Sequence, residues 1–198
     1  IGMPMKDVLH VGCGSASPVK LNATFRGGGW REIRLDIDPN VKPDIVASII
    51  DMSMIKDETV DAVWSSHNLE HLFPHEVPLA LGEFFRILKK DGFALITLPD
   101  LQQVAKLVAD DKLDEPAYMS PAGPIAPLDM IFGLRKSLAQ GNAFMGHKTG
   151  FTAKTLRIAL EKAGFSKAQL QQGTNFDLWA AAYKDPNAEP PNLIPANG

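Results

Sequence analysis

Two glycines and two aspartates in the first quarter of the chain have the spacing of a small-molecule site. Gly12 and Gly14 directly follow the apolar run Val8–Val11, so a buried strand would end where the backbone turns sharply or approaches a ligand. In α/β proteins the ligand at such a place is usually nucleotide-like. Asp36 and Asp51 each follow a further strand-like run. Their carboxylates could accept hydrogen bonds from a ribose and from an adenine amine.

The glycine turn departs from the dinucleotide-binding fingerprint. That fingerprint has a third glycine where this chain has Ser17, and it opens a helix whose N-terminus meets the pyrophosphate. Here Pro18 and the three glycines 27–29 make the segment a poor helix. A ligand without phosphate would not need that helix, so the sequence favours a nucleoside-like cofactor that carries none. Ile37, next to Asp36, could cover one face of an adenine.

Histidines that could act as general bases follow the apolar run 60–66. The motif SHNLEH, residues 66–71, would lie beside the expected ligand. We expect His67 to be the best placed to take a proton from an oxygen or nitrogen nucleophile, with a packing role or a backbone contact as the alternative. Glu70 and His71 are expected to form a hydrogen-bonded pair that orients the loop. The other candidate bases are His71, His75 and, if its segment folds back over the ligand, His147. Tyr118 and Asp129 belong to the same segment as His147 and would line the site with it.

Alternating and continuous apolar runs predict the elements that must position these residues. Strands are expected within residues 8–11, 31–36, 43–51, 60–66 and 93–100. A helix is expected within residues 75–92, with Lys89 and Lys90 near its C-terminus and Gly92 ending it. Strands that alternate with helices or other long connections are typical of parallel β units. We therefore predict an α/β fold with a doubly wound, mostly parallel sheet.

The C-terminal part of the chain predicts a different strand connection. Residues 151–165 read as a helix with Thr152 as its cap and Gly164 as its terminator. The strand-like segments 168–172 and 176–184 are separated only by Gly-Thr-Asn. Strands joined so tightly must be antiparallel, because a parallel return needs about a dozen residues. The sheet is therefore expected to finish in an antiparallel hairpin.

Residues 100–150 form a block that the simple alternation does not need, so we predict a helical insertion after the fifth strand. Helices are expected at 100–113, with Asp100 and Gln103 able to form a capping box, and at 127–141. An insertion there would lie over the ligand crevice as a lid and substrate wall. Residues 1–184 would form one domain, and the proline-rich residues 185–198 a disordered tail or an arm on a neighbour.

Composition limits the classes of partner. The 198 residues carry a formal charge of −3 with no basic run, so a nucleic-acid partner is not expected. Neither a signal peptide nor a membrane span is visible, and we expect a cytoplasmic protein without stable membrane insertion. Cys13 is the single cysteine and is expected to be a packing residue. No residues have metal-ligand spacing, so no metal is expected. The added helical wall and the tail are compatible with a homodimer.

Together these segments resemble the class I S-adenosylmethionine-dependent methyltransferases, especially the branch called type 11. The likeness covers residues 6–184 and lies in VLHVGCG, IRLDIDP, PDIVASIIDMS, VDAVWSSHNLEHL, EFFRILKKDGFALITLPD and FTAKTLRIALEKAGF. The resemblance implies a seven-stranded sheet with an antiparallel last strand. It also implies that S-adenosylmethionine is the cofactor and S-adenosylhomocysteine the product. The implied cofactor-binding residues are His10, Gly12, Cys13, Gly14, Asp36, Ile37, Asp51, Met52, Ser66 and His67.

Two positions depart from the pattern of that family. His10 stands where the family usually has an acidic residue that helps hold the amino group of the cofactor, and Ala16 stands where a third glycine is common. The expected activity is methyl transfer to a small-molecule, glycan or lipid-linked acceptor. One alternative is a regulatory protein that binds the cofactor without transferring its methyl group, which His10 and the shortened loop favour. Another is an NAD-dependent oxidoreductase, which Ser17 and the terminal hairpin oppose.

Overall fold

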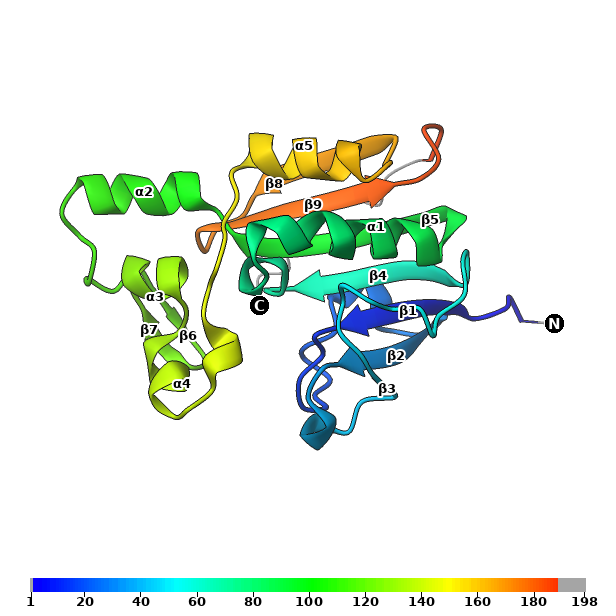
Figure 1. The fold of residues 1–198 in the computed structure, drawn as a ribbon, viewed down its shortest axis with the longest axis horizontal. Helices are drawn as coiled ribbons and strands as arrows, with labels where there is room; N and C mark the ends of the chain where they lie inside the picture. Colours follow the sequence, from blue (N-terminus) through cyan, green and yellow to red (C-terminus); the bar gives the residue numbers. More distant parts are fainter. Residues whose placement is uncertain (1, 189–198) are drawn as a thin grey trace.

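A seven-stranded sheet in the order β3-β2-β1-β4-β5-β9-β8 forms the centre of the structure, a computed structural model that describes residues 2–188 (Figure 1). β9 runs antiparallel to both of its neighbours, and the other strands run parallel to one another. The prediction of a doubly wound, mostly parallel sheet with an antiparallel last strand is confirmed. The strands are β1 (Lys6–Val11), β2 (Trp30–Asp36), β3 (Ile45–Val46), β4 (Val60–Ser66), β5 (Leu88–Pro99), β8 (Lys167–Gln172) and β9 (Asp177–Tyr183).

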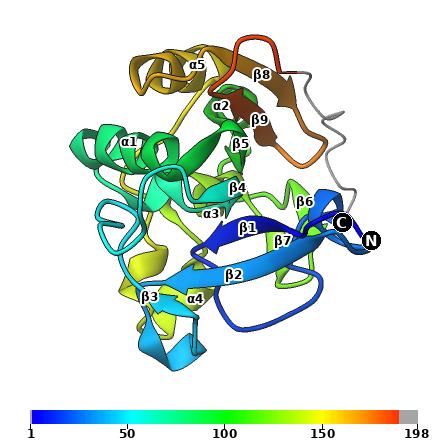
Figure 2. The same ribbon diagram turned by 90° about the vertical axis from the view of Figure 1, so that its right-hand side faces the viewer.

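Two helices, α1 (Val77–Ile87) and α5 (Ala153–Lys162), cover one face of this sheet (Figure 2). Because side chains alternate along a strand, every second residue of the central strands points toward them. The cap predicted for α5 is present, since the Thr155 N–H donates to Thr152 Oγ1 at 3.3 Å. This core includes Leu9, Val11, Leu35, Val63, Ile96, Leu81, Phe84, Leu156 and Leu160.

The other face of the sheet carries an aromatic layer, and the segment after β1 lies on it. No α-helix of residues 2–188 follows Gly14 directly; the segment contains only a short 3₁₀ turn, η1 (Ala23–Phe25), which agrees with the prediction of a poor helix. The buried Phe25 ring packs edge-on against Trp30, with ring centroids 4.9 Å apart. The indole of Trp64 donates to the Lys20 carbonyl at 2.9 Å. These contacts fix the segment on the sheet without the usual helix.

The boundary between α1 and β5 differs from the prediction. The helix ends at Ile87, and Leu88 already has extended backbone and lies in the core. Lys89 therefore belongs to β5, where its ammonium lies 3.3 Å from the Asp61 carboxylate. Gly92 also lies in β5; a Cβ there would be 2.9 Å from the Asp61 carbonyl oxygen. Burial of Leu88 and the close approach of two strands at Gly92 explain the early end of the helix.

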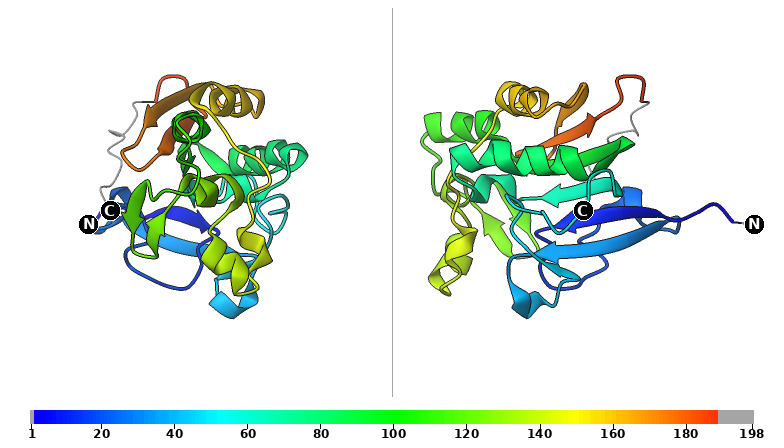
Figure 3. Two further views of the ribbon diagram at one scale, coloured as in Figure 1. Left: turned by 90° about the vertical axis from the view of Figure 1, so that its left-hand side faces the viewer. Right: turned by 45° about the vertical axis from the view of Figure 1, so that its right-hand side comes forward.

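The insertion stands beyond the carboxyl ends of the parallel strands (Figures 1 and 3). Asp100 caps α2 as predicted by accepting from the Gln102 N–H, but Gln103 donates to the Asp100 carboxylate instead of completing a capping box. The predicted helix 127–141 is broken at Gly133, where φ is +110° and a Cβ would lie 2.3 Å from the Met145 carbonyl oxygen. The elements are α2 (Leu101–Ala109), β6 (Tyr118–Ser120), β7 (Gly123–Ile125), α3 (Pro127–Phe132) and α4 (Arg135–Ala139).

Within residues 2–188 no helix combines the length and the apolar character needed to cross a bilayer. The proline-rich residues 189–198 lie outside the described residues.

The predicted third strand, within residues 43–51, is reduced to β3, Ile45–Val46. After it the chain forms an isolated β-bridge between Ser48 and Asp51. The predicted division into one domain and a tail stays a prediction.

Candidate functional site at the strand ends

The turn after β1 requires glycine for two independent reasons. Gly12 and Gly14 have φ of +57° and +62°, a region in which residues with a Cβ are strained. A Cβ on Gly12 would also lie 1.9 Å from Asn68 Oδ1. Asn68, just past β4, approaches so closely because its side-chain amide donates to the Val11 carbonyl at 2.6 Å. The ends of β1 and β4 are thereby joined at the point where the sequence predicted a ligand.

Asp36 lies directly beside this turn. The Gly14 N–H donates to Asp36 Oδ2 and the Asp38 N–H to Oδ1, each at 2.9 Å. An ionised carboxylate has about four acceptor positions, so two backbone donors leave room for two hydroxyl donors. Ile37, next to it, is 52% exposed although it is a large apolar residue. The structure therefore brings together Gly14, Asp36 and Ile37, as an adenosine site would need.

Arg34 is a part of this turn that the sequence reading did not identify. Its guanidinium donates to the Gly14 carbonyl and, at 2.9 Å, to the Lys42 carbonyl. It thus connects the glycine turn to the connection after β2. The signal was its position two residues before Asp36, because residues i and i+2 of a strand lie on the same face of the sheet.

Asp51 and Met52, the two residues predicted at the adenine, differ in exposure and in how many of their polar groups are already hydrogen-bonded. Asp51 is exposed, and its hydrogen bonds with Ser53 lower its pKa. Met52 is fully buried in the core. Its N–H donates to Glu83 at 2.6 Å, and its carbonyl accepts from Arg86 at 2.9 Å. Because both the side chain and the backbone groups of Met52 are already engaged, Asp51 is the better placed of the two predicted adenine contacts, which both stay predictions.

His10 and Cys13 are both buried beside the turn. His10 Nδ1 lies 2.9 Å from Glu32 Oε2, and burial lowers the pKa of His10 although Glu32 acts in the opposite direction. The ring of His10 is directed to the aromatic face, 6.3 Å from that of Trp64. Burial raises the pKa of the Cys13 thiol. The Cys13 N–H donates to the Leu35 carbonyl. The side chains of both residues therefore support the turn from within the protein.

Ser66 ends β4, and His67 starts the loop that follows it. His67 has φ +53°, and its N–H donates to the Thr97 carbonyl at 2.9 Å. The half-exposed His67 imidazole lies 3.4 Å from Glu70 Oε2. Partial loss of hydration would lower the pKa of His67, but the Glu70 carboxylate and, more weakly, Asp177 outweigh this effect and raise it. His67 is therefore held at the strand end by backbone and by carboxylate.

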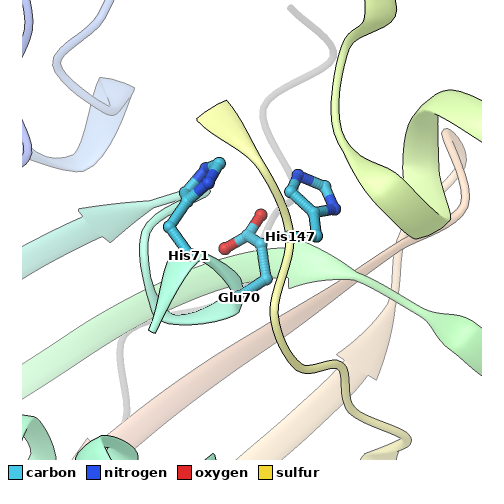
Figure 4. Close-up of side chains that lie close together, drawn as sticks. All are labelled: Glu70, His71 and His147. Atoms are coloured by element: carbon cyan, nitrogen blue, oxygen red, sulfur yellow. The ribbon is translucent and has the colours of Figure 1, made fainter. Parts of the chain in front are cut away.

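The insertion returns to this loop and brings His147 to Glu70 and His71 (Figure 4). The Lys148 N–H donates to the Glu70 carbonyl at 2.8 Å. The expected pair of Glu70 with His71 is not formed by a hydrogen bond, since His71 Nδ1 contacts the Gly146 carbonyl at 3.2 Å. Burial would raise the pKa of Glu70, but the surrounding histidines outweigh it and lower it.

The remaining candidates have other surroundings. His75 is exposed and stacks on Phe73, with ring centroids 5.9 Å apart, so it does not join the histidines at the strand end. Asp129 is paired with Arg135 at 2.9 Å and accepts from the Ala126 N–H, which makes it a structural cap of α3. Tyr118 stacks on Phe176 in the connection between β8 and β9. Tyr118 therefore connects the insertion to the loop between two strands of the sheet.

A comparison with protein families gives this geometry a context. Residues 9–96 match the model of a family described as a methyltransferase domain. This part of the chain, less than half of its length, is similar to that family. The matched residues run from β1 into β5 and so include the glycine turn, Asp36 and the loop after β4. No curated protein sequence matches the chain significantly.

Solved structures with a similar fold cover most of this chain. An S-adenosylmethionine-dependent methyltransferase from Archaeoglobus fulgidus has a TM-score of 0.59 at 17% identity, over 90% of this chain and 86% of the other. One from Methanosarcina mazei has a TM-score of 0.60 at 16% identity, over 92% and 94%. The Burkholderia thailandensis 1,6-didemethyltoxoflavin-N1-methyltransferase, solved with S-adenosylhomocysteine, has a TM-score of 0.53 at 16% identity, over 92% and 72%. At these identities the likeness shows a shared fold.

Proposed function

We propose that the chain is an enzyme that transfers a methyl group from S-adenosylmethionine to a small-molecule or glycan acceptor, which can be lipid-linked. The observation that carries this proposal is the unit formed by Gly12, Gly14 and Asp36 within a methyltransferase domain. The cofactor, when bound, supplies a methyl group already activated by a sulfonium. The protein must therefore mainly position the acceptor and exclude water, which can contribute roughly 7–11 kcal/mol.

The residues at the turn fit the cofactor part by part. The bare backbone of Gly12 and Gly14, both with positive φ and no side chain, can approach the methionine portion. Asp36 has acceptor positions left for the two ribose hydroxyls, a charge-assisted contact. Ile37 offers an exposed apolar surface to the adenine, and Asp51 an exposed carboxylate to its amine.

Polar atoms near the ends of β5 and β9 support a polar acceptor. Thr97 Oγ1, Asp177 Oδ1 and Trp179 Nε1 are buried and have no hydrogen-bond partner among residues 2–188. Thr97 and Trp179 are paired in register, and the Thr97 carbonyl also holds His67. A hydroxyl that can donate or accept, a carboxylate acceptor and an indole donor would suit a hydroxyl-bearing or amine-bearing substrate. His67 would take the proton that such a nucleophile loses.

Calorimetry with S-adenosylhomocysteine tests the cofactor site. Asp36→Asn should weaken binding about 10–100-fold, because hydrogen bonds to a charged group are worth about 1.5–3 kcal/mol. The matched control is Asp91→Asn, an exposed aspartate in the first half of β5, which should bind like the wild type. Circular dichroism should show the same fold for both variants. Equal affinity of Asp36→Asn and wild type would overturn the proposed site.

Turnover against a panel of hydroxyl and amine metabolites tests the activity itself. Cofactor binding without any transfer would favour the regulatory alternative, for which the pairing of His10 with Glu32 is the specific observation. A thermal shift with NAD and none with S-adenosylhomocysteine would instead favour the oxidoreductase.

A further inference from the structure

One carboxylate and two imidazoles converge where the insertion returns to the sheet. Glu70, His71 and His147 each offer a ligand atom, and these atoms lie within 4.8 Å of one another. Figure 4 shows the Glu70 carboxylate directed into the space between the two imidazole rings. We propose that these three residues bind one divalent metal ion of the zinc type. The expectation of no metal rested on spacing along the chain, which cannot show a contact made by a returning segment.

The Glu70 carboxylate is the observation that calls for a ligand. The residue is 1% exposed, and neither carboxylate oxygen has a hydrogen-bond partner among residues 2–188. His67 Nδ1, at 3.4 Å from Oε2, is a neighbour without the geometry of a hydrogen bond. A buried carboxylate that makes no hydrogen bond and has one imidazole at 3.4 Å is costly, and such groups in proteins are normally hydrogen-bonded or coordinate a metal. A cation between Glu70 and the two imidazoles would satisfy both oxygens.

The two histidines are held in the form that a metal requires. His71 Nδ1 lies 3.2 Å from the Gly146 carbonyl, and His147 Nδ1 lies 2.9 Å from the Met130 carbonyl. A carbonyl oxygen can only accept, so in both rings Nδ1 carries the proton and donates it. In the neutral imidazole the lone pair is then on Nε2. Metal-binding histidines are typically oriented by such a hydrogen bond from their other ring nitrogen.

The backbone holds the two ligand-bearing segments together. The Lys148 and Thr149 N–H groups lie 2.8 and 3.3 Å from the Glu70 carbonyl, and the His147 N–H donates to the Phe132 carbonyl at 3.0 Å. A tetrahedral ion with bonds of about 2.0–2.2 Å would draw the ligand atoms to about 3.4 Å from one another. Small side-chain rotations can provide this change, because the backbone of both segments is already in place.

The donor set indicates the class of ion. Two imidazoles and one carboxylate suit zinc and its neighbours in the first transition row, whereas magnesium and calcium prefer oxygen. Three protein ligands leave a coordination position for water or a substrate atom. Glu70 lies two residues after Asn68, so that position would be near the glycine turn. This last step rests on the proposed methyl transfer: we expect the open coordination position to take an oxygen or nitrogen atom of the acceptor.

Metal titration of the full chain without any cofactor tests the proposal. After dialysis against a chelator, one equivalent of Zn²⁺ should bind by calorimetry, and Co²⁺ should give the visible absorption of a low-coordinate site. Glu70→Gln and His147→Gln should each weaken Zn²⁺ binding by more than about 100-fold, since even the loss of an outer partner can cost 10–100-fold. His75→Gln, which changes an exposed histidine outside the cluster, should bind like the wild type.

Folding is checked in the chelated state by circular dichroism and thermal denaturation. Zn²⁺ should raise the Tm of the wild type and of His75→Gln but not that of His147→Gln. Because this comparison does not use Glu70→Gln, the test stays valid if that variant folds poorly. Absence of one-equivalent binding would overturn the proposal, as would unchanged binding by His147→Gln or an equal loss in His75→Gln. If the wild type binds S-adenosylhomocysteine but no Zn²⁺, the metal proposal fails and the proposed function stands. If it binds Zn²⁺ but no S-adenosylhomocysteine, the proposed function fails and the metal site stands.

Discussion

The substitution Gly12→Ala separates two costs that the structure assigns to one glycine. An alanine at φ +57° would be strained by about 1–2 kcal/mol. Its Cβ would also lie 1.9 Å from Asn68 Oδ1, so Asn68 must move and lose its 2.6 Å hydrogen bond to the Val11 carbonyl. That bond is worth about 0.5–1.5 kcal/mol. The expected loss of unfolding free energy is therefore about 1.5–3.5 kcal/mol.

Urea denaturation of a double-mutant cycle measures the two parts. In the Asn68→Ala background the clash is absent, and Gly12→Ala should cost only the strain of about 1–2 kcal/mol. Gly27→Ala is the matched control for strain alone, because Gly27 has φ +88° and a Cβ there would meet nothing within 4 Å. If Gly12→Ala costs no more than Gly27→Ala and the cycle shows no coupling, Asn68 does not join β1 to β4 as described.

Three further outcomes follow from groups buried near the turn and the aromatic layer. Cys13, 2% exposed and with a raised pKa, should react with Ellman's reagent at pH 8 much more slowly in the native protein than in denaturant; equal rates would contradict its burial. Trp64→Phe removes the donor to the Lys20 carbonyl and should speed tryptic cleavage between residues 15 and 29, with no change expected if that bond does not hold the segment. Burial raises the pKa of Tyr183 to about 12 from 10.0. A group with a raised pKa in the folded state stabilises the fold below its unfolded pKa, so Tyr183 should contribute stability that is lost between pH 10 and 12, as ultraviolet titration and denaturation at each pH would show.

The sheet and its ligand edge could be predicted because their signals are local. Alternating apolar residues identified β2, and the short connection, predicted as three residues and found as four, forced β8 and β9 to be antiparallel. The approach of Asp36 to Gly14 followed from the rule that parallel strands end at one edge. The end of α1 was missed because Lys89 favours a helix C-terminus, whereas the burial of Leu88 in β5 decided the boundary.

The insertion could not be predicted in the same detail, because tertiary contacts determine it. The β6–β7 hairpin lies in a proline-rich segment with no strand periodicity. The break at Gly133 exists because the Met145 carbonyl approaches it. One ligand of the candidate metal site belongs to this class: Glu70 and His71 are adjacent in sequence, but His147 reaches them through the insertion, where the backbone of the next residue, Lys148, contacts Glu70.

The two candidate sites share one short segment, and this gives them a common mechanical basis. Asn68 holds the glycine turn through the Val11 carbonyl, and Glu70, two residues later, holds the returning insertion through its own carbonyl. Asn68 directly precedes, and Glu70 belongs to, one 3₁₀ turn, η3 (Leu69–His71), which begins with the fully buried Leu69. Any displacement of this turn must therefore move the support of the cofactor backbone and the wall of the acceptor space together. Binding at either site would restrict the same turn, which favours coupling of the two binding events through its rigidity.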